Sequence, residues 1–223
     1  MRLIFKKEKL ENPIAILGGL PWIENIEDWP KIPSSEKYMT HFMTIFSNIS
    51  GDSFNSDCCI SVFISYDLDK DKYPKPSLSD KYTVHNQADL IRFKEYGYTK
   101  VIITKKRDAP ILDNMSEYSL PVLYVEKRNF TNEENEAYDK EFENSGMGLD
   151  GSTLMTNPYF EQDAIQFPMS EDILLQVDEW DLNDIFPDYK DIFQSGLAYL
   201  YLNKNYKKKQ MGETVGCFFT QHT

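Results

Sequence analysis

Short runs of β-branched and aromatic residues, each ended by polar residues, recur along the chain and predict strands. The clearest run covers 58–66 (Cys-Cys-Ile-Ser-Val-Phe-Ile-Ser-Tyr) and stops at a polar run. This composition suits a pleated, largely buried strand. On the same grounds, further strands are predicted at 99–104, 121–126, 173–178, 196–203 and 215–221.

Two segments have the spacing and end signals of helices. The first covers 86–96 and is followed by Gly97, which can end a helix with a positive φ. The second covers 131–144, where Thr131 and Glu134 have the spacing of a capping box. The first 80 residues contain six prolines, which predict a loop-rich region because proline lacks an amide donor.

The order of the predicted elements suggests a repeat. A proline-bearing loop, a buried strand and a second strand occur at 18–21, 42–46 and 60–66, and again at 157–160, 173–178 and 197–202. This order predicts a diverged internal duplication with halves at 14–125 and 150–221; chance similarity of strand spacing is the alternative. The predicted fold is an α+β fold, rich in mostly antiparallel sheets with a few helices, in a single compact domain over 1–223.

The amino-acid composition limits the kinds of molecule that the protein is expected to bind. The 223 residues contain 24 Lys and Arg against 36 Asp and Glu, which gives a net charge of −12. Clustered Lys and Arg provide affinity for nucleic acids and for anionic membranes, so neither partner is expected. Hydrophobic residues make up 41% of the chain, enough to predict a sizeable core.

The chain is predicted to be cytoplasmic. Its first ten residues hold only a short apolar stretch, and no apolar stretch approaches the length of a membrane helix. Three cysteines, Cys58, Cys59 and Cys217, do not form the even framework of a secreted domain. They are expected to be free and buried.

Negative charge is concentrated in two runs. Residues 133–143 contain six acids and one lysine, and residues 171–191 contain eight acids and one lysine. The simpler interpretation is a solvated helix face and a solvated loop. The alternative is a recognition surface that attracts a basic protein partner.

The sequence contains no combination of residues that is typical of a particular reaction, so no catalytic residue is predicted. His41, His85 and His222 are the only histidines, and nothing in their spacing pairs one with a cysteine. No metal site is predicted, because the chain lacks Cys-x-x-Cys and His-x-x-x-His spacing, and the acidic segment 178–184 lacks the glycine of a calcium loop. No cofactor is expected, because the glycines do not form a phosphate-binding motif.

Five residues remain as candidate binding residues. Gln176 and Asp178 are polar residues on an apolar strand, where they are expected to tie strands or loops together, with ligand contact as the alternative. Trp22, Trp29 and Trp180 are predicted in loops. Loop tryptophans are enriched at binding surfaces, although covering the edge of a β core is the more common role.

Several short motifs resemble a known family. Gly18-Gly-Leu-Pro21, followed by Trp29-Pro30, resembles the opening motif of the YwqG-like proteins, a bacterial family without an assigned activity. Residues 172–178 and 195–203 resemble two strands of that family. Met43-Thr-Ile45 stands where the family has a second glutamine, Phe193-Gln-Ser195 replaces a Trp-Gly-Asp stretch, and the loop at 164–168 lacks the family's glycine. The resemblance implies a β-rich α+β fold with an internal duplication and supplies no activity.

These observations lead to a function hypothesis with two alternatives. We predict a non-enzymatic, acidic protein-binding module, in its most concrete form an immunity-type protein that neutralises a basic partner. One alternative is a small-molecule-binding protein or hydrolase with a cleft between the two halves, near Gln176. The other is a homo-oligomer that assembles through a strand edge near Val122. The sequence leaves the oligomeric state open.

Overall fold

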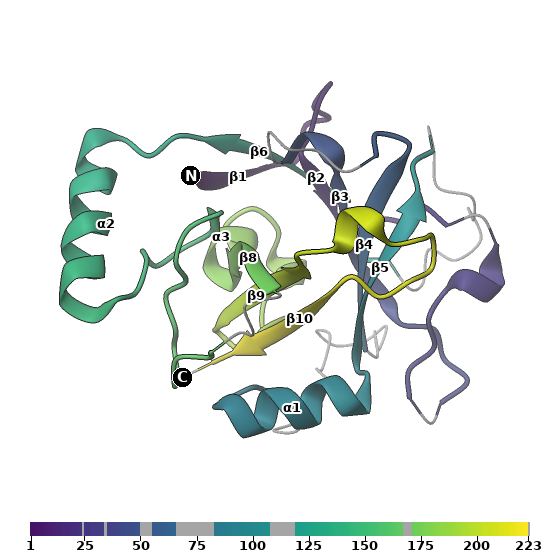
Figure 1. Ribbon diagram of the computed structural model, residues 1–223. Helices are drawn as coiled ribbons and strands as arrows, with labels where there is room; N and C mark the ends of the chain where they lie inside the picture. The colour runs from purple at the N-terminus through teal and green to yellow at the C-terminus, as the bar shows by residue number, and fades with distance from the viewer. Residues whose placement is uncertain are drawn as a thin grey trace.

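The computed structural model describes residues 1–23, 25–33, 35–49, 55–65, 83–107, 119–166 and 171–222. Ten strands from these residues form one sheet, and every pairing between named strands is antiparallel (Figure 1). The β-rich, antiparallel fold with a few helices is therefore confirmed. The strands are β1 (Arg2–Lys6), β2 (Ala15–Leu17), β3 (Thr40–Phe46), β4 (Cys58–Ile64), β5 (Thr99–Lys105), β6 (Leu123–Arg128), β7 (Thr153–Leu154), β8 (Glu171–Asp178), β9 (Leu197–Asn203) and β10 (Gly216–Gln221).

The sheet nearly closes on itself. Its order is β10-β9-β8-β7-β1-β6-β2-β3-β4-β5, so two four-stranded meanders flank the central pair β1 and β6. The two end strands approach each other, because Val215 donates its N–H to the Val101 carbonyl at 2.8 Å and Thr99 Oγ1 donates to the Phe218 carbonyl at 2.6 Å. These contacts cover backbone groups that an open sheet would expose at its edges.

The helices begin and end at the signals in the sequence. Helix α1 (Gln87–Tyr96) starts at Asn86, whose side chain accepts from two backbone N–H groups, and ends at Gly97 with φ of +68°. Helix α2 (Asn132–Ser145) starts at a capping box between Thr131 and Glu134. Both predicted helices are confirmed. The remaining helical segments are α3 (Glu179–Asn183) and the 3-10 turns η1 (Ile26–Asp28), η2 (Ser47–Ile49), η4 (Pro187–Tyr189) and η5 (Tyr206–Lys208).

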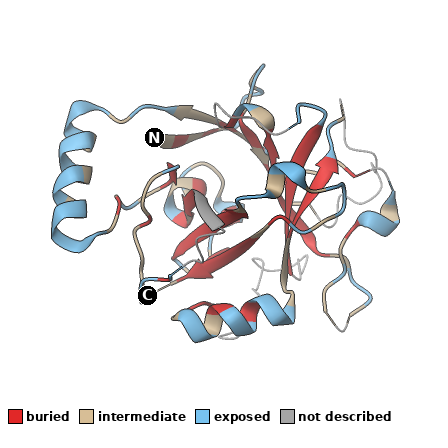
Figure 2. Cartoon of the chain, in the orientation of Figure 1, coloured by how far each residue is buried: buried red, intermediate tan, exposed pale blue. Residues whose placement is uncertain are grey.

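The core has two parts on opposite faces of β4. Ile60 and Val62 contribute to the larger part, which fills the space enclosed by the sheet (Figure 2). Phe63 belongs to a smaller cluster outside it, covered by the segment between β2 and β3. Every residue of β4 is therefore buried, which explains why its sequence is apolar except for Ser61. The Ser61 hydroxyl is hydrogen-bonded to that of Thr104 at 2.8 Å. Cys58 and Cys59 are free and buried, as predicted.

The second acidic run was interpreted as a solvated loop, and the structure corrects this for most of its length, although Asp184 and Asp188 are exposed. Residues 171–178 form β8, which pairs with both β7 and β9, and the run continues into α3. Glu179 has only 4% of its surface exposed and Tyr189 has none. Strand pairing and burial override the local charge pattern here. The same result corrects the placement of Trp180, which lies in α3 and not in a loop.

Two elements of the N-terminal region were not predicted. Strands β1 and β2 have five and three residues, too few for a periodic pattern, and both pair with β6 from more than 100 residues later in the chain.

Because β6 has neighbours on both sides, the strand edge predicted near Val122 is not free for oligomer assembly. Within the described ranges, no helix is long and apolar enough to cross a membrane.

Candidate functional site

The five candidate binding residues lie at two separate places. Trp22 and Trp29 belong to the segment between β2 and β3. Gln176, Asp178 and Trp180 lie where β8 passes into α3. A groove of about 570 Å³ is lined in part by Trp22, and none of the other four contributes to its wall. The structure therefore does not bring the five residues together.

Gln176 joins two loop segments to β8. It is 1% exposed, and its Nε2 donates to the carbonyls of Leu149 at 3.1 Å and Gly151 at 2.7 Å. Its Oε1 accepts from the N–H of Tyr159 at 2.8 Å. All of these partners are backbone groups, so the amide has a structural role in holding the loops on either side of β7.

Replacing Gln176 with Leu is expected to lower the free energy of unfolding by about 2–4 kcal/mol, because each buried polar group left without a partner costs about 1–3 kcal/mol. The measurement is urea denaturation at pH 7. Gln210→Leu, at an exposed position in a turn, is the matched control and should change stability by less than about 0.5 kcal/mol. Equal stability of the two variants would show that the hydrogen bonds of Gln176 contribute nothing to the fold.

Asp178 and Glu179 hold the start of α3 and the loop that follows it. The Asp178 side chain accepts from the N–H of Trp180 at 2.9 Å. Burial, with smaller contributions from Asp181 and Asp150, raises the pKa of Asp178 to about 6. Glu179 accepts from three backbone N–H groups of the loop before β9, namely those of Asp191, Phe193 and Ser195 at 2.9, 2.6 and 3.1 Å.

The three tryptophans differ in exposure. Trp29 is 2% exposed, and its Nε1 donates to the Met39 carbonyl at 2.7 Å, so it is a core residue of the smaller cluster. Trp22 is half-buried, with its ring edge-on to Phe46 at 5.6 Å. Trp180 is 60% exposed on α3.

His41 organises the Gly18-Gly19 turn, a role that the sequence analysis missed. It is buried, and its Nδ1 lies 3.1 and 3.2 Å from the carbonyls of Gly18 and Gly19. Two acceptors require a proton on Nδ1, so Nε2 accepts from Thr44 Oγ1 at 2.9 Å. Burial lowers the pKa of His41 to about 4. The signal in the sequence was a single histidine within an apolar strand.

Helix α2 stands away from the sheet, on the side opposite β3, β4 and β5 (Figure 1), and buries none of its residues. Its main polar attachment is Glu134, which accepts from Arg128 at 2.5 and 2.9 Å and from Arg2 at 3.0 Å. These hydrogen bonds lower the pKa of Glu134 to about 2, and those from Arg128 contribute most. Tyr138 is tied by a bond from Asn157 Nδ2 at 3.1 Å.

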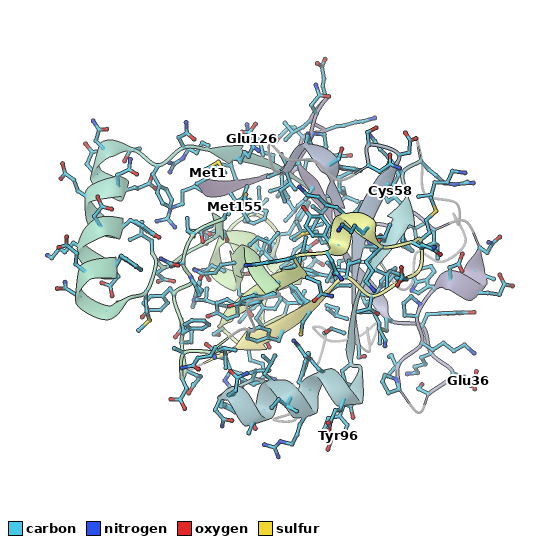
Figure 3. The ribbon with its side chains drawn as sticks, viewed as in Figure 1. Met1, Glu36, Cys58, Tyr96, Glu126 and Met155 are labelled. Carbon is cyan, nitrogen blue, oxygen red and sulfur yellow. The ribbon has the colours of Figure 1, made fainter. Side chains whose placement is uncertain are left out.

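The outer side of α2 is strongly acidic. We define the α2 acidic face as Glu133, Glu136, Asp139 and Glu143, all of which are exposed. Figure 3 shows side chains of α2 that project away from the rest of the protein. Lys140 is the one cation of the helix. Beside this face, the rings of Tyr138 and Phe142 lie parallel, with centroids 6.2 Å apart, and Phe142 is 46% exposed. The helix therefore presents carboxylates and an aromatic pair to its surroundings.

Among the described residues, no group of three or more His, Cys, Asp or Glu side chains is placed to hold a metal ion.

No protein-family model matches the sequence, and no curated protein matches it. The resemblance to the YwqG-like family therefore stays a prediction, and any inference about function rests on this chain's own residues.

Proposed function

We propose that the protein is a binding module that recognises a basic protein through helix α2. The observation that carries the proposal is a helix of 14 residues with no buried residue. Most helices in globular proteins gain their stability by packing an apolar face on the core. Helix α2 instead depends on its capping box, its Gly146 end and the Glu134 contacts.

The charge of α2 defines the chemistry of the partner. Its sequence holds six acids and one lysine, and only Glu134 of these acids forms an ion pair among the residues that the structure describes. An acidic surface of this kind attracts a basic protein and excludes acidic ones. The exposed Phe142 beside the acidic face offers the apolar contact that a specific interface adds to charge.

An immunity-type role is the most concrete form of this proposal. The basic partner would then be an effector domain, and binding would block its cationic surface. The sequence contains no combination of residues that is typical of a known reaction, and this supports a binding role over an enzymatic one. The cytoplasm remains the proposed location.

Capture from a lysate of the source organism at low and moderate salt tests the proposal. The α2 variant Glu133→Gln, Glu136→Gln, Asp139→Asn, Glu143→Gln removes four exposed charges. The control variant Glu8→Gln, Glu27→Gln, Glu95→Gln, Asp188→Asn removes four exposed charges on other elements. We expect a basic protein to be retained by the wild type and the control but lost by the α2 variant.

The purified partner should then bind the α2 variant about tenfold more weakly than the control at low salt, and by less at high salt, because exposed charges are screened. Equal binding of the two variants would refute a role for α2. Protection assays against basic effector domains would separate the immunity-type role from other kinds of binding.

We also propose that the two meanders derive from an internal duplication. Each begins with a short strand ending in leucine, Leu17 or Leu154, followed by a residue with positive φ, Gly18 or Met155. The next strand of each has a register shift, between His41 and Met43 in β3 and between Ile173 and Leu175 in β8. These shared irregularities support the proposal. When the two register shifts are aligned, Thr44 of the first half corresponds to Gln176 of the second.

The alternative of a ligand cleft between the halves stays a prediction. Gln176 was its central residue, and its hydrogen bonds to Leu149, Gly151 and Tyr159 favour a structural role.

A further inference from the structure

A groove opens on the first meander, at the turn that follows β2. Its volume is about 570 Å³, within the range of about 300–1,000 Å³ that is typical of small-molecule sites. Its lining includes the Gly18-Gly19 turn and Trp22, residues of the loop after β1, and Lys106 and Arg107, which follow β5. The groove thus combines segments that are distant in the sequence, and it lies away from helix α2.

The charge of this groove is opposite to that of the protein. Among the described residues, its lining includes three cations, Lys9, Lys106 and Arg107, and one acid, Glu11. Lys9 and Lys106 are exposed, and within the described residues neither forms an ion pair with a carboxylate. Three positive charges around one cavity of a chain with a net charge of −12 favour an anionic occupant.

Aromatic side chains lie beside these cations. The rings of Trp22 and Phe46 meet edge to face at 5.6 Å, and the Lys106 ammonium lies 5.8 Å from the centre of the Phe46 ring. Tyr124 of β6 also lines the groove. A flat ring can stack on such a surface while its negative group reaches the lysines.

The turn itself is held rigidly, which suits a preformed site. His41 fixes the carbonyls of Gly18 and Gly19 from the core side. The N–H of Gly18 donates to the Phe42 carbonyl at 2.8 Å, and the N–H of Gly19 donates to the Leu120 carbonyl at 2.9 Å. A wall that does not rearrange loses less entropy when a ligand binds.

We propose that this groove binds a small organic anion that carries an aromatic ring, with a carboxylate or a phosphate as the negative group. This site is independent of the surface on α2, so each proposal can fail without the other. Lys9, Lys106 and Arg107 would hold the negative group, and Trp22 would contact the ring.

Isothermal titration calorimetry with paired probes tests the charge and the ring separately. Adenosine 5′-monophosphate is compared with adenosine, indole-3-acetate with tryptamine, and inorganic phosphate is added alone. An acidic pentapeptide centred on phenylalanine tests a peptide occupant. We expect at least one ring-bearing anion to bind with a Kd below about 1 mM, and at least tenfold more tightly than its uncharged or cationic analogue and than phosphate alone.

The variant Lys9→Glu, Lys106→Glu reverses both exposed lysines of the groove. The control Lys140→Glu, Lys208→Glu makes the same change of net charge on α2 and η5. All four positions are exposed, so both variants should keep the melting temperature of the wild type. Binding of the anion should weaken at least tenfold in the groove variant and by less than threefold in the control.

Three results would overturn the proposal. The first is that no ring-bearing anion binds with a Kd below about 1 mM. The second is equal affinity in the groove variant and the control. The third is tighter binding of adenosine, tryptamine or the acidic peptide than of every small anion tested, which would assign the groove to another class of ligand.

Discussion

Replacing Gly18 with Ala is expected to lower the free energy of unfolding by about 2–5 kcal/mol, a large part of the 5–15 kcal/mol that is typical of a whole domain. Gly18 has φ of +64°, which costs an L residue about 1–2 kcal/mol. A Cβ at this position would lie 2.2 Å from the Pro121 carbonyl oxygen and 2.8 Å from Tyr189 Oη. Relieving that overlap adds about 1–3 kcal/mol.

Gly212→Ala is the matched control for this effect. Gly212 has φ of +81°, but a Cβ there would meet nothing within 4 Å. Its cost should therefore be limited to the backbone, about 1–2 kcal/mol. Urea denaturation of both variants gives the difference that is due to close packing. Equal losses in the two variants would show that the turn after β2 can move away from Pro121 and Tyr189.

The expected effect at Gly18 reflects its place in the fold. The end of β2, the segment before β6 and the turn η4 meet there, and Tyr189 Oη donates to the Pro121 carbonyl at 2.6 Å. This junction connects the first meander to the segment between β8 and β9. A disturbance at Gly18 therefore affects contacts between the two halves of the chain.

Acid is expected to destabilise the wild type more than the variant His41→Asn. The pKa of His41 in the folded protein is about 4, below its ordinary value of 6.5. Above pH 6.5 both the folded and unfolded states are neutral at this residue. Between pH 6.5 and pH 4 the unfolded state binds the proton first, so stability falls by about 3 kcal/mol over this window and no further below it.

Asparagine is the informative replacement because its Nδ2 can take the place of His41 Nδ1 and donate to the Gly18 and Gly19 carbonyls without titrating. Asp178 acts in the opposite direction, since its raised folded pKa of about 6 stabilises the protein as the pH falls. The difference in unfolding free energy between wild type and His41→Asn removes this contribution. That difference should change by about 3 kcal/mol in favour of the variant from pH 7 to pH 4. A constant difference would contradict a buried, neutral His41.

Local patterns in the sequence were sufficient for elements that carry their own signals. Strand β4 was predicted from its apolar run, and α1 and α2 from caps at Asn86, Thr131 and Gly97. Strands β1 and β2 were not predicted because their pairing with β6 depends on contacts more than 100 residues away in the chain. The near closure of the sheet likewise depends on β5 and β10, which no local pattern connects.

The candidate site was harder to predict because adjacent positions in the sequence do not show which distant residues surround a buried or a charged side chain. Gln176 was correctly singled out as a polar residue on a buried strand, but its loop partners could not be identified from sequence. The groove escaped prediction because Lys9, Lys106 and Trp22 come from three distant segments. The acidic run at 133–143 was visible at once, yet only the structure shows that its helix buries nothing.

Hydrogen–deuterium exchange in the presence and absence of the captured basic partner is the most direct test of the proposed function. The amides of α2 should exchange rapidly in the free protein, because an unpacked helix opens locally at little cost in free energy. The proposed function predicts that the partner slows exchange across 132–145. Unchanged exchange in α2, with protection at other elements, would contradict recognition through this helix.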